Sequence, residues 1–183
     1  KIRGSTTAKY KSGILSTYDY FYSTSGMDDY PAQVAMMDRN IRDTSAPVIS
    51  TSQVIRCGKI LKMVASKLGK TEDVAVYESD IERLTNALTK YSWDKDSGYF
   101  SYVLHDENYE PIKKFTTADG ENINKGLDGI YPIIANVCDE KQKERANATA
   151  DYVYNRWMDE YERKQEGYQF TLFEVPYEAY AWC

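Results

Sequence analysis

The strongest constraint on the fold is a pair of adjacent stretches with helical periodicity, residues 45–68 and 71–88. Apolar or small residues of the first stretch recur every three or four positions: Val54, Cys57, Gly58, Leu61, Val64, Ala65 and Leu68. The second stretch has a similar face: Val74, Tyr77, Ile81, Leu84 and Leu88. Gly69 is a helix-stop residue because glycine readily adopts positive φ. Two amphipathic helices joined by so short a turn must pack antiparallel, so the sequence predicts a helical hairpin.

The ends of this hairpin carry start signals. Ser45 is a candidate N-cap of the first helix, and Pro47 is tolerated in its first turn. Thr71 is the candidate cap of the second helix, where Glu72-Asp73 would lie favourably at the positive end. Gly58 in mid-helix costs about 1 kcal/mol relative to alanine, so we expect it to permit close approach of another helix.

The totals describe one globular domain spanning residues 1–183. Hydrophobic residues make up 42% of the chain and charged residues 28%, which excludes a disordered polymer. A net charge of -5 argues against binding to nucleic acid. No apolar run is long enough to span a membrane, and no signal peptide is visible, so the compartment stays open between the cytoplasm and export from a bacterial cell.

The three cysteines fit neither a zinc site nor a disulfide framework, because they are widely spaced and odd in number. Cys57 falls on the apolar face of the first helix, so we expect it to be a buried free thiol. No metal site is predicted from these residues.

Residues 91–126 lack helical periodicity and predict a small irregular or β-hairpin insertion. Within it, Tyr99–Leu104 is expected to pair with residues near Ile112–Phe115. Asp94–Gly98 resembles the start of a calcium loop, but the twelfth position is His105 instead of glutamate, so a turn is the preferred interpretation. His105 itself is expected to be a loop residue.

Two further helices are predicted. Leu127–Val137 is an apolar helix interrupted by Pro132, and Glu140–Lys164 is a longer polar helix ended by Gly167. Together with the hairpin they give a mainly α fold.

An acidic, aromatic loop precedes the first helix. Asp28 and Asp29 follow Gly26, and Tyr30-Pro31 comes directly after them. Further aromatic residues, Tyr22 among them, lie just upstream. Adjacent acids flanked by rings suit glycoside cleavage, in which one acid protonates the leaving oxygen and the rings stack on the sugar. The alternative is an ordinary acidic turn.

Three segments together resemble a known family. Ser25–Pro31 is similar to the Ser-Gly-(Leu/Met)-Asp-Asp-Tyr-Pro signature of glycoside hydrolase family 63, the processing α-glucosidases and their bacterial relatives, which belong to a trehalase-related clan. Trp93–Phe100 is similar to the family's Trp-Asp-x-x-x-Gly-Tyr-Tyr segment, and Leu127–Ala135 to its Asp-Gly-Ile-x-Pro-Leu-x-Ala segment. The three segments occur in the family's order.

The resemblance implies an (α/α)6 toroid of helical hairpins and an inverting hydrolase. Its substrate would be an α-linked gluco- or manno-configured sugar, with no cofactor. Asp28 would be the general acid and Asp29 a substrate-binding residue. Four aromatic residues would form the walls of the sugar subsites: Tyr22, Tyr30, Trp93 and Tyr99.

The general base is the weakest part of the resemblance. Glu178 fits the family's Glu-x-Tyr pattern, Glu174 is its rival, and neither precedes the expected Gly-rich, Trp-containing segment. The third alternative is that this chain has no base. Ala32-Gln33 also replaces the arginine that usually follows Tyr-Pro in the family.

The chain is short for a complete toroid. Six helix pairs need on the order of 200 residues even when compact. The resemblance therefore implies an incomplete toroid, with a further chain or subunit as the partner that completes it. The alternative function is a non-catalytic helical domain that binds carbohydrate or protein and retains the glycosidase scaffold.

Overall fold

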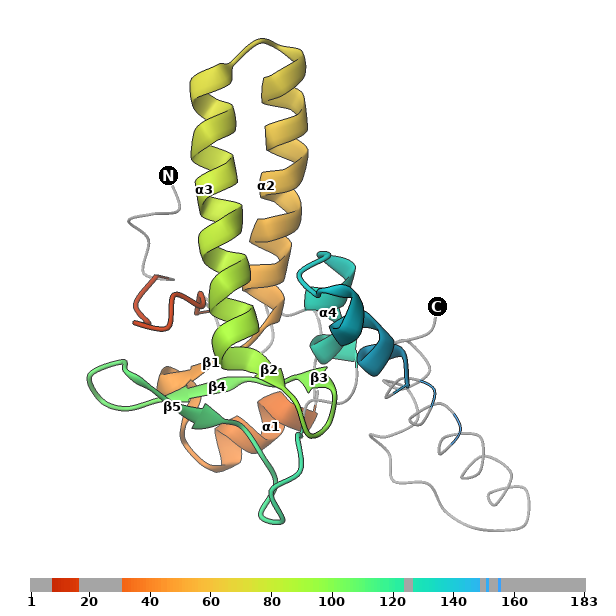
Figure 1. Cartoon of the computed structure of the whole chain (residues 1–183). Helices are drawn as coiled ribbons and strands as arrows, with labels where there is room; N and C mark the ends of the chain where they lie inside the picture. The colour runs from red at the N-terminus through yellow and green to blue at the C-terminus, as the bar shows by residue number, and fades with distance from the viewer. Residues whose placement is uncertain (1–7, 17–30, 124–126, 149–150, 152–154, 156–183) are drawn as a thin grey trace.

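The computed structural model describes residues 8–16, 31–123, 127–148, 151 and 155. This part of the chain is mainly helical, as predicted. Helices α2 (Ile49–Lys67) and α3 (Thr71–Ala87) form a long antiparallel hairpin whose far end projects beyond the other elements (Figure 1). Helix α1 (Pro31–Asp38), five short strands and α4 (Leu127–Ile134) gather around the base of this hairpin.

The turn of the hairpin confirms the stop signal at Gly69. Its φ is +67°, and its N–H donates to Ser66 O (3.2 Å), while Lys70 N–H donates to Ala65 O (2.9 Å). This pair of hydrogen bonds is a Schellman motif, which satisfies carbonyl groups at the end of α2.

The predicted start signals are wrong for both helices. Ser45 lies in strand β1 (Ser45–Ala46), and α2 begins four residues later at Ile49 without a side-chain cap. The backbone of Ser45 is used for pairing with Leu104, and its hydroxyl donates to Ile41 O (2.8 Å). Thr71 is the first residue of α3 and does not cap it; the cap position is held by Lys70, also without a capping hydrogen bond.

The contact between α2 and α3 explains Gly58 and corrects Cys57. A Cβ atom at Gly58 would lie 3.1 Å from Ile81 Cγ1, so the predicted close approach of the second helix is confirmed. Cys57 is exposed, and the prediction of a buried thiol there is wrong. It lines an open groove between α2 and α3, to the side of the close contact at Gly58. The buried free thiol is instead Cys138, and burial raises its pKa to about 12.

Two small antiparallel sheets occupy the predicted insertion. In the first, β4 (Val103–His105) pairs with β5 (Pro111–Lys114), as expected, and β1 adds on the other side of β4. In the second, β2 (Trp93–Asp94) pairs with β3 (Tyr99–Phe100). Tyr99 and Phe100 therefore do not belong to the predicted pairing with Ile112–Phe115. The addition of β1 was not predicted, because only two of its residues pair.

Helix α4 lies beside the lower part of α2 (Figure 1). The predicted helix is present, but it runs through Pro132 without interruption and ends at Ile134, three residues before the predicted end at Val137. Lys59 of α2 connects the two helices, because its Nζ donates to Ala135 O (2.6 Å) and Asn136 O (3.1 Å) just after the end of α4. A cation at a helix C-terminus is favourable. Residues 140–148 are helical, and most of the predicted helix beyond them, with Gly167, lies outside the described residues.

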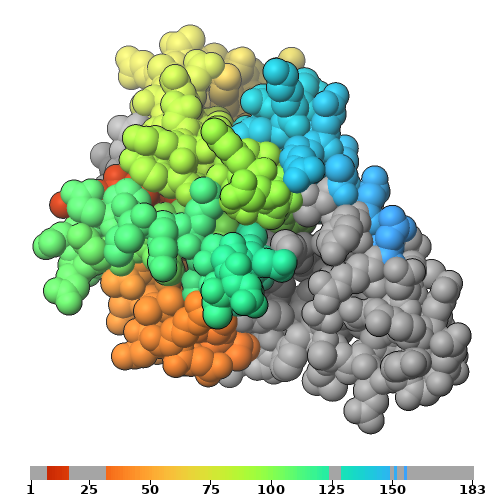
Figure 2. Space-filling view, turned by 60° about the horizontal axis from the view of Figure 1, so that its bottom comes forward, coloured from red at the N-terminus to blue at the C-terminus, as the bar shows by residue number. Residues whose placement is uncertain are grey.

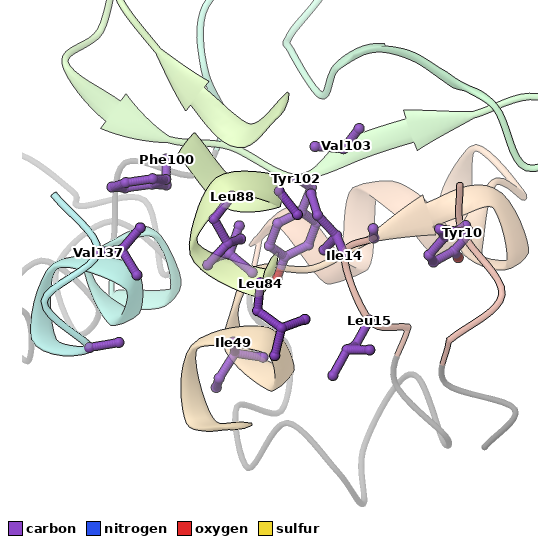
Figure 3. Close-up of a cluster of buried hydrophobic side chains, with 14 of the residues drawn as sticks. Tyr10, Ile14, Leu15, Ile49, Leu84, Leu88, Phe100, Tyr102, Val103 and Val137 are labelled. Carbon is purple, nitrogen blue, oxygen red and sulfur yellow. The ribbon is translucent and has the colours of Figure 1, made fainter. Parts of the chain in front are cut away.

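One buried cluster joins the hairpin base to the strands and to α1 and α4. Figure 3 shows Tyr102 near its centre, between Leu88 and Ile14, with Leu84 close by. Tyr102 is fully buried, and its hydroxyl has no hydrogen-bond partner among the described residues. By contrast, the hydroxyl of Tyr10 lies 2.8 Å from Ser45 O and 3.0 Å from Asp43 O.

These two tyrosines should respond oppositely to loss of the hydroxyl. Tyr102→Phe removes a buried polar group without a partner, so the free energy of unfolding should stay unchanged or rise. Tyr10→Phe removes the donor of the hydrogen bond to Ser45 O and should lower the free energy of unfolding by about 0.5–1.5 kcal/mol. Urea denaturation of both variants beside the wild type measures the difference. An equal loss in both would contradict the assignment.

Valine at position 58 should weaken the hairpin. Because even a Cβ atom there lies 3.1 Å from Ile81, Gly58→Val should destabilise the protein by about 1–3 kcal/mol. The same substitution in an Ile81→Ala background should cost less, since the shortened side chain makes room. Equal costs in the two backgrounds, measured by a denaturation cycle, would show that the contact is not limiting.

Candidate functional site

Most of the predicted site residues lie outside the part of the chain that the structure describes. These are the proposed acid and its neighbour, two aromatic residues, and both candidate bases: Asp28, Asp29, Tyr22, Tyr30, Glu178 and Glu174. Of the predicted site, the structure describes Trp93 and Tyr99.

Trp93 and Tyr99 lie on the β2–β3 hairpin but differ in exposure. Trp93 is half-buried, and its ring meets Phe100 edge-on at a centroid distance of 5.0 Å. Tyr99 is 1% exposed. A sugar can stack only on an accessible ring face, so Tyr99 offers none in this conformation, whereas Trp93 keeps part of its surface accessible.

The turn between β2 and β3 is stabilised by hydrogen bonds within the turn and by two residues from later in the chain. Ser97 donates both its N–H and its hydroxyl to Asp94 Oδ2, and Asn122 Nδ2 donates to Ser97 Oγ (3.0 Å). Arg145, from the helical residues 140–148, donates to Asp96 O (3.0 Å). Figure 2 shows this blue segment against the yellow-green turn. The predicted turn is confirmed, and no group of three or more His, Cys, Asp or Glu side chains among the described residues is arranged to hold a metal ion.

Residues at the ends of the three family-like segments meet in the same core. Ala32 directly follows the first segment, Phe100 closes the second and Ala135 closes the third; all three belong to the buried cluster. Helix α4 also lies against β3, so the second and third segments are neighbours in space. The structure therefore brings together chain regions about 100 positions apart in the sequence.

Gln33 is the nearest unusual polar group to the predicted acid pair in the sequence. It lies in the first turn of α1, is 2% exposed, and its Oε1 has no hydrogen-bond partner within the part of the chain that the structure describes. A buried amide oxygen left unpaired costs about 1–3 kcal/mol, so it is a candidate acceptor for a ligand hydroxyl or a water molecule. Sequence reasoning noted this position only as the loss of an arginine.

His105 is a buried residue of β4, and the prediction that it is a loop residue is wrong. Its Nδ1 lies 3.2 Å from Thr44 O and its Nε2 lies 2.8 Å from Ser12 Oγ. Tyr10 stacks on the imidazole at a centroid distance of 4.1 Å. Since a carbonyl oxygen can only accept, Nδ1 carries the proton and Nε2 accepts from Ser12.

A serine hydroxyl bonded to a histidine resembles a nucleophile and its base. Here, however, Ser12 is 5% exposed and His105 is 3% exposed, and the ring is covered by Tyr10. Both side chains are almost completely enclosed, so a substrate could not reach the pair in this conformation. The arrangement fastens β4 to the N-terminal segment. No sequence motif points to this contact, because Ser12 and His105 are 93 positions apart.

His105 should make stability depend on pH. Burial lowers its pKa below 6.5, its ordinary value, so the unfolded chain binds the proton more readily. This contribution to stability is complete above about pH 6.5 and is lost as the pH falls toward the lower folded-state pKa.

The chain has one histidine, so its NMR titration needs no assignment by mutation. We expect a midpoint below 6.5, together with a free energy of unfolding that falls from about pH 7 to pH 5. His105→Gln should flatten that part of the curve. A folded-state midpoint at or above 6.5 would contradict the predicted direction.

The hairpin carries a groove of about 630 Å³ between α2 and α3. Its lining is mostly apolar and includes Val54, Leu61, Ile81 and Leu84. Asp73 and Asp80 of α3 also line it. Exposed Cys57 lies on its other wall.

No helix among the described residues is both long and apolar enough to cross a bilayer. Comparisons of the chain with models of protein families, with curated proteins and with solved structures give no match.

Proposed function

We propose that this chain is part of a family 63-like inverting α-glycoside hydrolase that acts on α-linked gluco- or manno-configured sugars. Because no family model matches, the proposal depends on three short segments and their relation in space. The observation that carries it is the meeting of Ala32, Phe100 and Ala135 in one core cluster. Segments that build one active site must be held by one rigid core.

In the proposed reaction, Asp28 protonates the glycosidic oxygen while a carboxylate base removes a proton from the attacking water. Inversion requires the two carboxyl groups to lie about 6.5–9.5 Å apart, leaving room for that water. Asp28 must stay protonated near neutral pH, and adjacent Asp29 favours this by like-charge repulsion. Glu178 is the proposed base.

The sugar would contact aromatic rings and polar groups. Of the two proposed subsite residues that the structure describes, Trp93 has accessible ring surface. Tyr22 and Tyr30 are the other proposed walls of the subsite. Asp29 would bind sugar hydroxyl groups. Tyr99 is left out of this role because it is buried.

The α2–α3 hairpin would be one helix pair of an (α/α)6 toroid, and a further chain or subunit would supply the missing pairs. The chemistry requires a carbohydrate substrate and water and does not require a redox cofactor.

Hydrolysis assays test the proposal. The wild-type protein should release product from aryl α-glucosides, aryl α-mannosides or α-linked disaccharides, and the first product seen by proton NMR should be the β-anomer. Asp28→Asn should lower kcat by about 10²–10⁴-fold, the usual contribution of a general acid. Asp38→Asn is the matched control, because Asp38 is an exposed aspartate at the end of α1.

A folded wild-type protein that hydrolyses none of these substrates would contradict the enzymatic proposal. Equal activity of the Asp28 and Asp38 variants would contradict the role of Asp28. Retention of anomeric configuration would exclude a single displacement.

The second candidate function is a non-catalytic helical domain that binds carbohydrate or protein. The groove on the hairpin favours it, since an accessible apolar surface is a common feature of binding domains. Saturable binding of an α-linked disaccharide without turnover, measured calorimetrically, would favour this candidate.

A further inference from the structure

The upper part of the α2–α3 hairpin, which projects beyond the other elements, exposes several large apolar side chains. Leu61 and Val64 of α2 and Leu68, which directly follows α2, have exposed fractions of 46%, 44% and 67%. Val76 faces the same groove from α3 and is 46% exposed. Contiguous apolar surface of this kind marks an interaction site.

The dimensions of this surface suit a helix. Val54 lies in α2, and Leu68 directly follows the last residue of α2, 14 positions later. At 1.5 Å per residue, the groove and the exposed apolar residues beyond it therefore extend over about 21 Å. Two helices lying side by side leave a long depression between them, and an amphipathic helix can lay its apolar face into such a groove. Gly58 brings α2 and α3 close together beneath it.

Charge distinguishes the two sides of the groove. Asp73 and Asp80 lie seven residues apart on α3, which places them on one face about 10 Å apart along the helix axis. Arg83 Nη2 lies 3.5 Å from Asp80 Oδ1, and Asp73 is exposed to solvent in the first turn of α3. None of the described lining residues is basic.

We propose that this groove binds an amphipathic helix of a partner protein. The partner helix would place apolar side chains against Leu61 and Val76, with two lysine or arginine side chains seven residues apart facing Asp73 and Asp80. Opposite charges at the edge of an apolar contact would set its orientation and specificity. This goes beyond the proposed glycosidase, whose chemistry lies in other segments.

A second copy of the chain suits the groove less well. The chain carries a net charge of -5. A twofold contact of this groove with itself would also gather the Asp73 and Asp80 carboxylates of both copies into one patch. Like charges brought together in an interface oppose association.

Two labelled synthetic peptides of 16 residues test the proposal by fluorescence anisotropy. Both carry leucine at heptad spacing; one has lysine at two positions seven residues apart beside the apolar stripe, and the other has glutamate there. The lysine peptide should bind the wild-type chain at least about tenfold more tightly. Asp73→Lys combined with Asp80→Lys should reverse that preference, and the corresponding double asparagine variant should abolish it.

Two further variants serve as controls. Glu78→Lys also replaces an acidic residue of α3 by lysine, but on the other side of the hairpin, where Glu78 pairs with Lys62. It should leave the preference for the lysine peptide unchanged. Leu61→Ser should weaken the binding of both peptides, because it removes an apolar contact in the groove. Circular dichroism and urea denaturation establish that each variant is folded.

Equal binding of the two peptides, or a preference that survives the double lysine variant, would overturn the proposal. A stable dimer in sedimentation experiments that is broken by Leu61→Ser would also overturn it, since the occupant would then be a second copy. None of these outcomes depends on hydrolysis, so the proposal and the glycosidase assignment can fail separately.

Discussion

The burial of Tyr102 at the base of the hairpin is the contact on which the described structure depends. This residue follows β3 and precedes β4, and its ring lies among side chains from α3 and the N-terminal segment (Figure 3). Burying a large aromatic side chain contributes about 1.5–3 kcal/mol. One ring therefore ties the strands to the hairpin, although its hydroxyl stays without a partner in the part of the chain that the structure describes. The buried ring of Tyr102 thus adds apolar contact to the core, while its hydroxyl group loses its hydrogen bonds to water.

Polar contacts then fix elements that the core alone would leave free to slide. His105 connects β4 to Ser12 and to Thr44, and Lys59 holds the end of α4 against α2. Arg145 contacts the turn between β2 and β3. Hydrogen bonds are directional, so each of these contacts selects one relative position of two segments that are distant in the sequence. The closeness of the family-like segments in space depends on these contacts.

The two ends of the hairpin differ in how far their apolar side chains are buried. Its base is part of the core, with Leu84 and Leu88 buried, whereas its upper half exposes Leu61 and Leu68. A helix pair that served only to support the core would need no apolar residues there. The proposed chemistry and the proposed partner site therefore belong to different regions of the chain, the first near the core and the second along the projecting helices.

The sequence by itself determined the helical hairpin, its stop at Gly69, the close approach at Gly58 and the pairing of β4 with β5. All of these follow from local periodicity, backbone preference or neighbouring strands. It failed at Ser45, Cys57 and His105 because tertiary contacts decided their environment. Ser45 pairs with a strand almost 60 positions away, Cys57 lies beside rather than on the helix contact, and His105 bonds to Ser12 across 93 positions.

For the candidate site, sequence suggested the residues and only tertiary structure could sort them. Trp93 and Tyr99 are both aromatic and close in the chain, yet one keeps accessible surface and the other is enclosed. The buried amide oxygen of Gln33, which has no partner among the described residues, and the groove between α2 and α3 could likewise not be predicted from the sequence. Local preference is set by neighbours along the chain, whereas burial and charge placement are set by whatever segments the fold brings alongside.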